Sequence, residues 1–213
     1  GRRSDVRPRT GMRLGPPIVV TLLATLAGCA AGSRSVLHSS LPVHARPRIA
    51  VLPLEDLSGE MDAAVGFSRL LFAEIVRSGR WDVVESGVVE GVMDSLSLRD
   101  GATLTRAQVQ VLGERLAATH LLTGTLLESE RVKMGDGEVP AVGAVLKLLE
   151  VSTTRAVWAE SRFYTGEDRE TVFGWGRERN PQMVAGTLAG LMIKDLTVRT
   201  ADSTAAPGTG KPK

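Results

Sequence analysis

Residues 48–54 constrain the fold of this chain more than any other segment. They read Arg-Ile-Ala-Val-Leu-Pro-Leu, an almost wholly apolar run that ends at a proline. A short run of this kind indicates a buried central strand, and Pro53 ends it because proline has no amide proton for the strand ladder. The chain is therefore expected to build a sheet around this strand.

The next two segments supply a helix and a second strand. Between residues 62 and 78 apolar side chains recur at helical spacing, and Gly79 follows as a C-terminal stop. The apolar positions are Phe67, Leu70, Leu71 and Ile75. Residues 81–85 are typical of a second short strand. A strand–helix–strand opening favours parallel pairing of the two strands.

The remainder completes an α/β pattern. One helix is expected after Ser86, which can cap it, and another after Thr105, which forms a capping-box pattern with Gln108. Three strands follow from about residues 119, 139 and 156, and Asn180-Pro181 starts a last helix. The predicted order is β-α-β-α-α-β-β-β-α, a mixed parallel and antiparallel sheet of about five strands with helices packed on it.

The amino-terminal segment has the order of an export signal. Basic residues come first, an apolar run covers residues 18–26, and small residues close it. The run is shorter than the roughly 20 residues that span a bilayer. We expect residues 1–28 to be removed, with Met12 as the natural start and residues 1–11 as an upstream extension. A twin-arginine signal at Arg2-Arg3 is an alternative.

The closing tetrapeptide resembles the lipobox of bacterial lipoproteins. It consists of Leu26, Ala27, Gly28 and Cys29. The resemblance implies a diacylglyceryl group on the Cys29 sulfur, cleavage before Cys29 and acylation of the new amine; several acyl chains together anchor a protein stably. Alanine rather than aspartate follows, so the inner-membrane retention pattern is missing and the periplasmic face of the outer membrane is expected. An ordinary cleaved signal with a chance cysteine is the alternative.

The mature chain divides into three parts. Residues 29–47 are the lipidated cysteine and a small, polar, proline-bearing stretch, which predicts a flexible tether. Residues 48–199 are expected to form one domain, and residues 200–213 a disordered tail. Five arginines and one aspartate precede Cys29, so 21 of the 26 basic and 23 of the 24 acidic side chains remain. This near-neutral balance argues against nucleic acid as a partner.

Several motifs together resemble the CsgG, LpoB and TolB amino-terminal family of bacterial envelope proteins. Residues 49–59, Ile-Ala-Val-Leu-Pro-Leu-Glu-Asp-Leu-Ser-Gly, are similar to its opening strand and loop. Residues 117–125, Ala-Ala-Thr-His-Leu-Leu-Thr-Gly-Thr, are similar to a strand that carries Thr-Gly. The late hairpin also resembles the family, although Thr153-Thr154 stands where Thr-Gly is usual. The resemblance covers about residues 49–165 and implies an envelope location, but members include pores, synthase activators and adaptors.

A self-sufficient secretion pore is disfavoured by the charges. Transmembrane strands need about 9–11 residues with an apolar outer face. The candidate hairpin at residues 121–151 carries charged or polar side chains on both faces near its tip. The other candidate insertion, residues 166–179, carries seven charges in 14 residues.

An enzyme is not expected either, because catalysis needs positioned acids, bases or nucleophiles. His38 and His44 lie in the tether, and His120 at the start of a strand is interpreted as structural. Glu55-Asp56 is interpreted as a solvated acidic loop rather than a cation site. No cluster has metal-ligand spacing, and the one cysteine is committed to lipid. No cofactor is therefore expected beyond the covalent lipid on Cys29.

The remaining class is an interaction protein. Residues 173–180 place two aromatics and two arginines in a loop before the last helix, and these side chains are favoured interface anchors. The candidate contacts are Phe173, Trp175, Arg177 and Arg179. Alternatively, the two aromatics cap the core. We predict an outer-membrane-anchored assembly or adaptor lipoprotein that binds another envelope protein or its own copies; a small-molecule or glycan-binding module is the alternative, and a pore subunit is less favoured.

Overall fold

The computed structural model describes residue 1 and residues 34–37, 46–134, 137–169 and 176–205. Seven strands and four helices lie within this part of the chain. Their bounds are β1 Arg34–Leu37, β2 Arg48–Val51, β3 Glu55–Asp56, α1 Ala63–Ser78, β4 Asp82–Val83, α2 Ser86–Ser95, α3 Arg106–Arg115, β5 His120–Met134, β6 Gly137–Glu150, β7 Arg155–Thr165 and α4 Pro181–Ala205.

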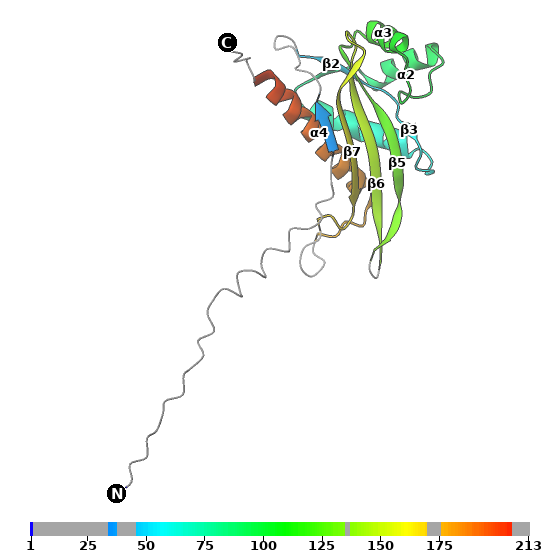
Figure 1. Ribbon diagram of the computed structural model, residues 1–213. Coiled ribbons are helices and arrows are strands. Elements are labelled where there is room, and N and C mark those ends of the chain that lie inside the picture. Colours follow the sequence, from blue (N-terminus) through cyan, green and yellow to red (C-terminus); the bar gives the residue numbers. More distant parts are fainter. Residues whose placement is uncertain (2–33, 38–45, 135–136, 170–175, 206–213) are drawn as a thin grey trace. The chain divides into compact units, whose positions relative to one another are not determined.

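The strands form one mixed sheet in the order β1-β7-β6-β5-β2-β4, with β3 beside β5. β2 is parallel to β4 and β5, whereas β5, β6 and β7 are antiparallel. The predicted mixed α/β fold and element order are confirmed, and β1 and the two-residue β3 are additional. In Figure 1, β5 and β6 form a long hairpin whose tip points away from the end of the sheet that carries α2 and α3.

Helices cover both faces of the sheet. Alternate residues of a strand point to opposite sides, so Ile49 and Val51 enter the core beneath α1 and α4, whereas Ala50 and Leu52 enter the core beneath α2 and α3. The predicted apolar stripes of α1 and α4 are confirmed, because their central positions are buried. These are Phe67, Leu71 and Ile75 on α1, and Val184, Leu188 and Met192 on α4.

Local sequence signals set most helix ends. The capping box of Thr105 and Gln108 is present, and Gly79 ends α1 with a left-handed φ of 64°. At α4, the Oδ1 of Asn180 accepts from the backbone N of Gln182 at 3.0 Å. The predicted cap at Ser86 is wrong, because this residue is the first of α2 and the preceding residue makes no side-chain cap. No helix in the described ranges has the length and apolarity needed to cross a membrane.

Two boundaries differ from the predicted ones. Residues 34–37 fall inside the predicted tether, yet they form β1, which pairs antiparallel with β7 from Arg34↔Ser161 to Leu37↔Trp158. The cause is the edge of β7, whose open amide and carbonyl groups any extended segment can satisfy. α4 continues beyond residue 199 to Ala205, so residues 200–205 of the predicted tail are helical. Thr200 is buried there and donates to the Leu196 carbonyl at 2.8 Å.

Candidate functional site

The residues predicted as sites fall into two groups. Six lie outside the described residues: Leu26, Ala27, Gly28, Cys29, Phe173 and Trp175. Arg177 and Arg179 lie within the residues that the structure describes. The Arg177 guanidinium is half-buried and forms an ion pair with Glu167. The Arg179 side chain is exposed, and its carbonyl accepts from Nη2 of Arg131 on β5 at 3.4 Å. The two predicted arginines therefore lie beside the β5–β6 hairpin.

Backbone hydrogen bonds fix this neighbourhood to the hairpin. The amide of Gly166 donates to the Pro140 carbonyl on β6 at 2.9 Å. The amide of Glu178 in turn donates to the Gly166 carbonyl at 2.7 Å. Residues on both sides of 170–175 are thus joined to each other and to β6, which positions the start of α4 beside the hairpin.

A groove of about 600 Å³ opens where the first turns of α1 and α4 meet the hairpin, and we call it the α1–α4 groove. Its floor includes the buried side chains of Phe67, Leu126 and Val142. Its polar lining includes three carboxylates and one guanidinium, from Glu60, Asp62, Glu130 and Arg131. The groove is therefore an apolar trough with an excess of negative charge at its rim.

Exposed apolar side chains lie at the groove and in the adjoining loop. Met61, which lines it, is 89% exposed, and Leu57 and Val65 close by in sequence are 60% and 46% exposed. Large apolar side chains left in water mark contact sites when they gather in one place. Sequence reasoning missed the groove because three segments far apart in the chain form it; an apolar Met61 between charged neighbours was the available signal.

His120 lies in the core. It is 2% exposed, its ring meets Trp81 edge to face at 5.9 Å, and its Nδ1 is 2.9 Å from the Thr119 hydroxyl. Burial lowers the pKa of the imidazole, although the carboxylate of Glu150 raises it. An uncharged imidazole against an indole supports the structural interpretation of this residue.

The acidic loop at residues 55–56 was predicted to be solvated, but Asp56 in it has a structural role. Asp56 accepts hydrogen bonds from the Ser58 amide at 3.0 Å, the Ser58 hydroxyl at 2.6 Å and the Ala64 amide at 3.0 Å. Partial desolvation raises the pKa of this carboxyl, but the hydrogen bonds from Ser58 and Ala64 outweigh it and the pKa is lowered. Asp56 thus satisfies an amide in the first turn of α1. Within the described ranges no group of three or more His, Cys, Asp or Glu residues could hold a metal.

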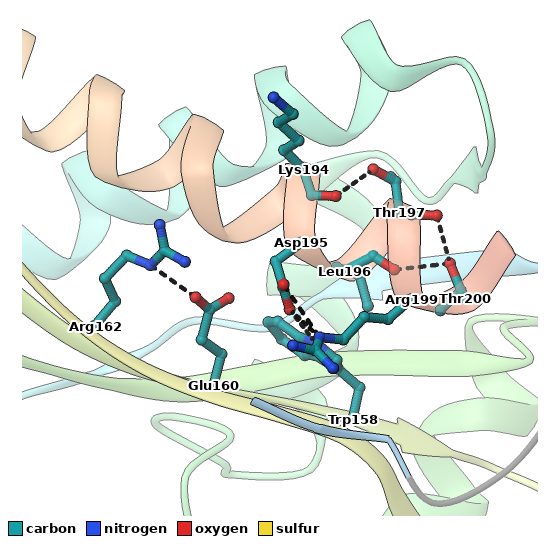
Figure 2. Close-up of polar contacts among 9 residues, drawn as sticks. All are labelled: Trp158, Glu160, Arg162, Lys194, Asp195, Leu196, Thr197, Arg199 and Thr200. Atoms are coloured by element: carbon teal, nitrogen blue, oxygen red, sulfur yellow. Dashed lines mark hydrogen bonds and ion pairs between the residues drawn. The ribbon is translucent and has the colours of Figure 1, made fainter. Parts of the chain in front are cut away.

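Sequence reasoning missed a partly buried polar cluster between β7 and α4, shown in Figure 2. Glu160 is 1% exposed, and its Oε1 accepts from Nε of Arg162 at 2.7 Å. Asp195 accepts from the Trp158 indole at 3.2 Å and from Nε of Arg199 at 2.9 Å. The period of two along β7 was the available signal, because residue 160 must share the core-facing side of residue 158.

The electrostatics of Glu160 are unusual. Its Oε2 is buried without a hydrogen-bond partner among the described residues. Burial raises the pKa of this carboxyl from 4.5 to about 7, even though the guanidinium of Arg162 lowers it. The raised pKa follows from the position of Glu160 in the core between β7 and α4, so we interpret the cluster as a structural element of this interface.

Comparisons with known proteins bear on the fold. No family model and no curated protein matches the chain. Among solved structures, a PelC dodecamer from Paraburkholderia phytofirmans has a TM-score of 0.53 at 20% identity, covering 78% of this chain and 98% of that one. Lipoprotein GNA1162 from Neisseria meningitidis has a TM-score of 0.51 at 17% identity, covering 74% and 99%. The chain therefore shares its fold with PelC and with the lipoprotein GNA1162.

Proposed function

We propose that this protein is an outer-membrane lipoprotein, anchored through Cys29 on the periplasmic side, that assembles with its own copies through the α1–α4 groove. The observation that carries the proposal is the 89% exposure of Met61 on an apolar groove. Self-assembly is favoured over a different partner because PelC, which shares the fold, is described as a dodecamer. A catalytic role is not proposed.

The groove suits a contact between unlike surfaces. A head-to-tail contact joins one patch of a subunit to a different patch of the next, and repetition closes a ring when the rotations between neighbours add up to a full turn. The groove supplies an apolar floor, and its acidic rim favours a neighbour that presents an apolar side chain beside basic groups. Fully burying a methionine contributes about 1.5–3 kcal/mol, and every 1.4 kcal/mol changes a dissociation constant about tenfold.

The test measures the mass of the unlipidated mature chain, carrying Cys29→Ser, by light scattering over a range of concentrations. We expect concentration-dependent oligomers, and Met61→Asp should weaken association by about ten- to a hundredfold because it puts a charge on the contact. Val88→Asp is the matched control, since Val88 on α2 is also exposed, at 52%, but lies outside the groove. A monomer at all concentrations, or equal effects of both variants, would contradict the self-assembly proposal.

A small-molecule or glycan-binding module is the second candidate. The groove volume of about 600 Å³ falls within the 300–1,000 Å³ of ligand pockets, which is the observation in its favour. The test adds cell-wall glycan fragments to the native chain and to Ala185→Trp, a variant in which the new side chain fills the groove. A higher melting temperature of the native chain alone would support a binding module. A stoichiometric protein partner recovered from envelope extract would instead support an adaptor.

A further inference from the structure

β1 fixes the point at which the amino-terminal segment leaves the domain. Its residue Arg34 pairs with Ser161 of β7, which pairs with Val145 of β6. Because β1 is antiparallel to β7, the Arg34 end of β1 faces the end of β7 at Thr165. Thr165 is level with Ala141, so this is the end of the sheet at which β5 and β6 form the hairpin tip.

The chain between the lipid-modified residue and β1 is short. Cys29 and Arg34 are five residues apart in the sequence. A fully extended chain spans about 3.4 Å per residue, so this connection reaches about 17 Å at most. Without β1, the next strand of the sheet is β2 at Arg48, 19 residues from Cys29; the reach would then be about 65 Å.

The hairpin is longer than this connection. Along β6, Val145 at the level of Arg34 is eight residues from Gly137, which pairs with Met134 at the tip. At about 3.3 Å per residue, the tip extends about 26 Å beyond the start of β1. When the strands stand upright on the membrane, a connection of about 17 Å cannot hold the membrane surface clear of a projection of about 26 Å.

The opposite end of the domain is out of reach. Between the level of Thr125, which pairs with Val145, and His120 lie five residues of β5, about 17 Å. α2 and α3 also lie toward that end (Figure 1). The connection would have to reverse direction and use its whole length only to reach the end of the sheet.

We propose that β1 orients the anchored domain on the membrane, with the β5–β6 hairpin tip resting against the lipid headgroups and α2–α3 facing away. The proposal depends on the lipid anchor at Cys29. The tip carries both signs of charge, with exposed Arg131 and Lys133 beside Glu130 and Glu138, so these charges do not by themselves favour a lipid surface of one charge. The contact is imposed by the short connection.

The experiment uses the lipidated chain in vesicles of phosphatidylethanolamine and phosphatidylglycerol that contain a headgroup-labelled quencher lipid. A fluorophore is placed either at the tip, through Lys133→Cys, or on α2, through Glu90→Cys; both positions are exposed. The native sequence has one cysteine, and its sulfur is occupied by lipid, so each variant has a single reactive thiol. We expect several-fold stronger quenching at position 133 than at position 90.

A second variant separates orientation from attachment. Replacing residues 34–37 by Gly-Ser-Gly-Ser keeps the chain length but weakens pairing with β7, and it should bring the two positions toward equal quenching while the protein stays on vesicles. The unlipidated Cys29→Ser chain should not float with vesicles. Equal quenching at both positions in the vesicle-bound native chain, or stronger quenching on α2, overturns the orientation alone. Identical flotation with and without Cys29 removes the anchor, and the orientation with it.

Discussion

The buried carboxyl of Glu160 makes the stability of the domain depend on pH in a direction opposite to that of most carboxylates. Burial raises its pKa in the folded state from 4.5 to about 7. The folded protein therefore holds a proton that the unfolded chain releases, so stability is fully present below pH 4.5 and is lost as pH rises to about 7. At about 1.36 kcal/mol per pH unit, ionised Glu160 costs the fold about 3 kcal/mol at pH 8.

The substitution Glu160→Gln isolates this cost, because glutamine keeps the shape and an oxygen acceptor for Arg162 but cannot ionise. Urea unfolding of the mature chain should give the glutamine variant an advantage at pH 8. The free energy of unfolding of the variant minus that of the native chain should fall by about 2–3 kcal/mol between pH 8 and pH 5. Contributions of other titrating groups are the same in both chains and cancel in this stability difference. The exceptions are groups that face Glu160, which are Arg162, Asp195 and Arg199.

Glu90→Gln on the exposed face of α2 is the control, and its effect should be flat over the same range. A stability difference between the native chain and Glu160→Gln that does not change from pH 5 to pH 8 would refute the reasoning. It would mean that the carboxyl remains ionised throughout, with its charge satisfied by Arg162.

Three further substitutions test the packing of the sheet. His120→Phe should reduce the loss of stability that the native chain shows below pH 6.5. Burial lowers the pKa of His120, so in this pH range the unfolded imidazole binds a proton more readily than the folded one. Urea unfolding of both chains at pH 5 and pH 7 measures the difference. Thr154→Gly should stabilise the chain by about 0.5–1 kcal/mol in urea unfolding, because Thr154 has a left-handed φ of 55° that glycine adopts without strain. Gly124→Ala should destabilise the chain by about 2–4 kcal/mol, because a Cβ at Gly124 would meet the Val145 carbonyl oxygen and push β5 away from β6. A lower melting temperature, followed by circular dichroism, measures this effect.

The sequence predicted those parts of the fold that depend on local pattern. The period of 3.6 in α1 and α4, the capping box at Thr105 and the stop at Gly79 each act within a few residues, so they could be located without a structure. β1 could not, because residues 34–37 have no strong strand pattern and depend on an open edge about 120 residues later in the chain. Thr154 shows the same limit, since the hairpin imposes a conformation that the local sequence disfavours.

The candidate site was harder to predict than the fold. The motif before α4 led to Arg177 and Arg179, and these lie near the groove, but the apolar floor comes from α1, β5 and β6. No window of the sequence contains all of these elements. The inward position of Glu160 could be predicted from alternation along β7. Its raised pKa could not, because it depends on how α4 packs on the sheet.

The groove and the proposed membrane orientation make a joint prediction. Pro140, which lines the groove, is three residues from Gly137 at the tip, about 10 Å along β6. In copies held by the same short connection, the grooves would lie at one height above the lipid, and the lateral contacts that close a ring would be aligned before they form. Confinement to one surface also raises the effective concentration of neighbours.

Association should therefore be stronger for the lipidated chain in vesicles than for Cys29→Ser in solution at equal protein amounts. Chemical crosslinking on vesicles should give a ladder of multimers that Met61→Asp shortens and Val88→Asp leaves unchanged. Replacing residues 34–37 by Gly-Ser-Gly-Ser should shorten the ladder while the protein remains membrane-bound, because the grooves would no longer be held at one height. A ladder that persists in this variant but disappears with Met61→Asp would show that the groove drives assembly without help from the orientation.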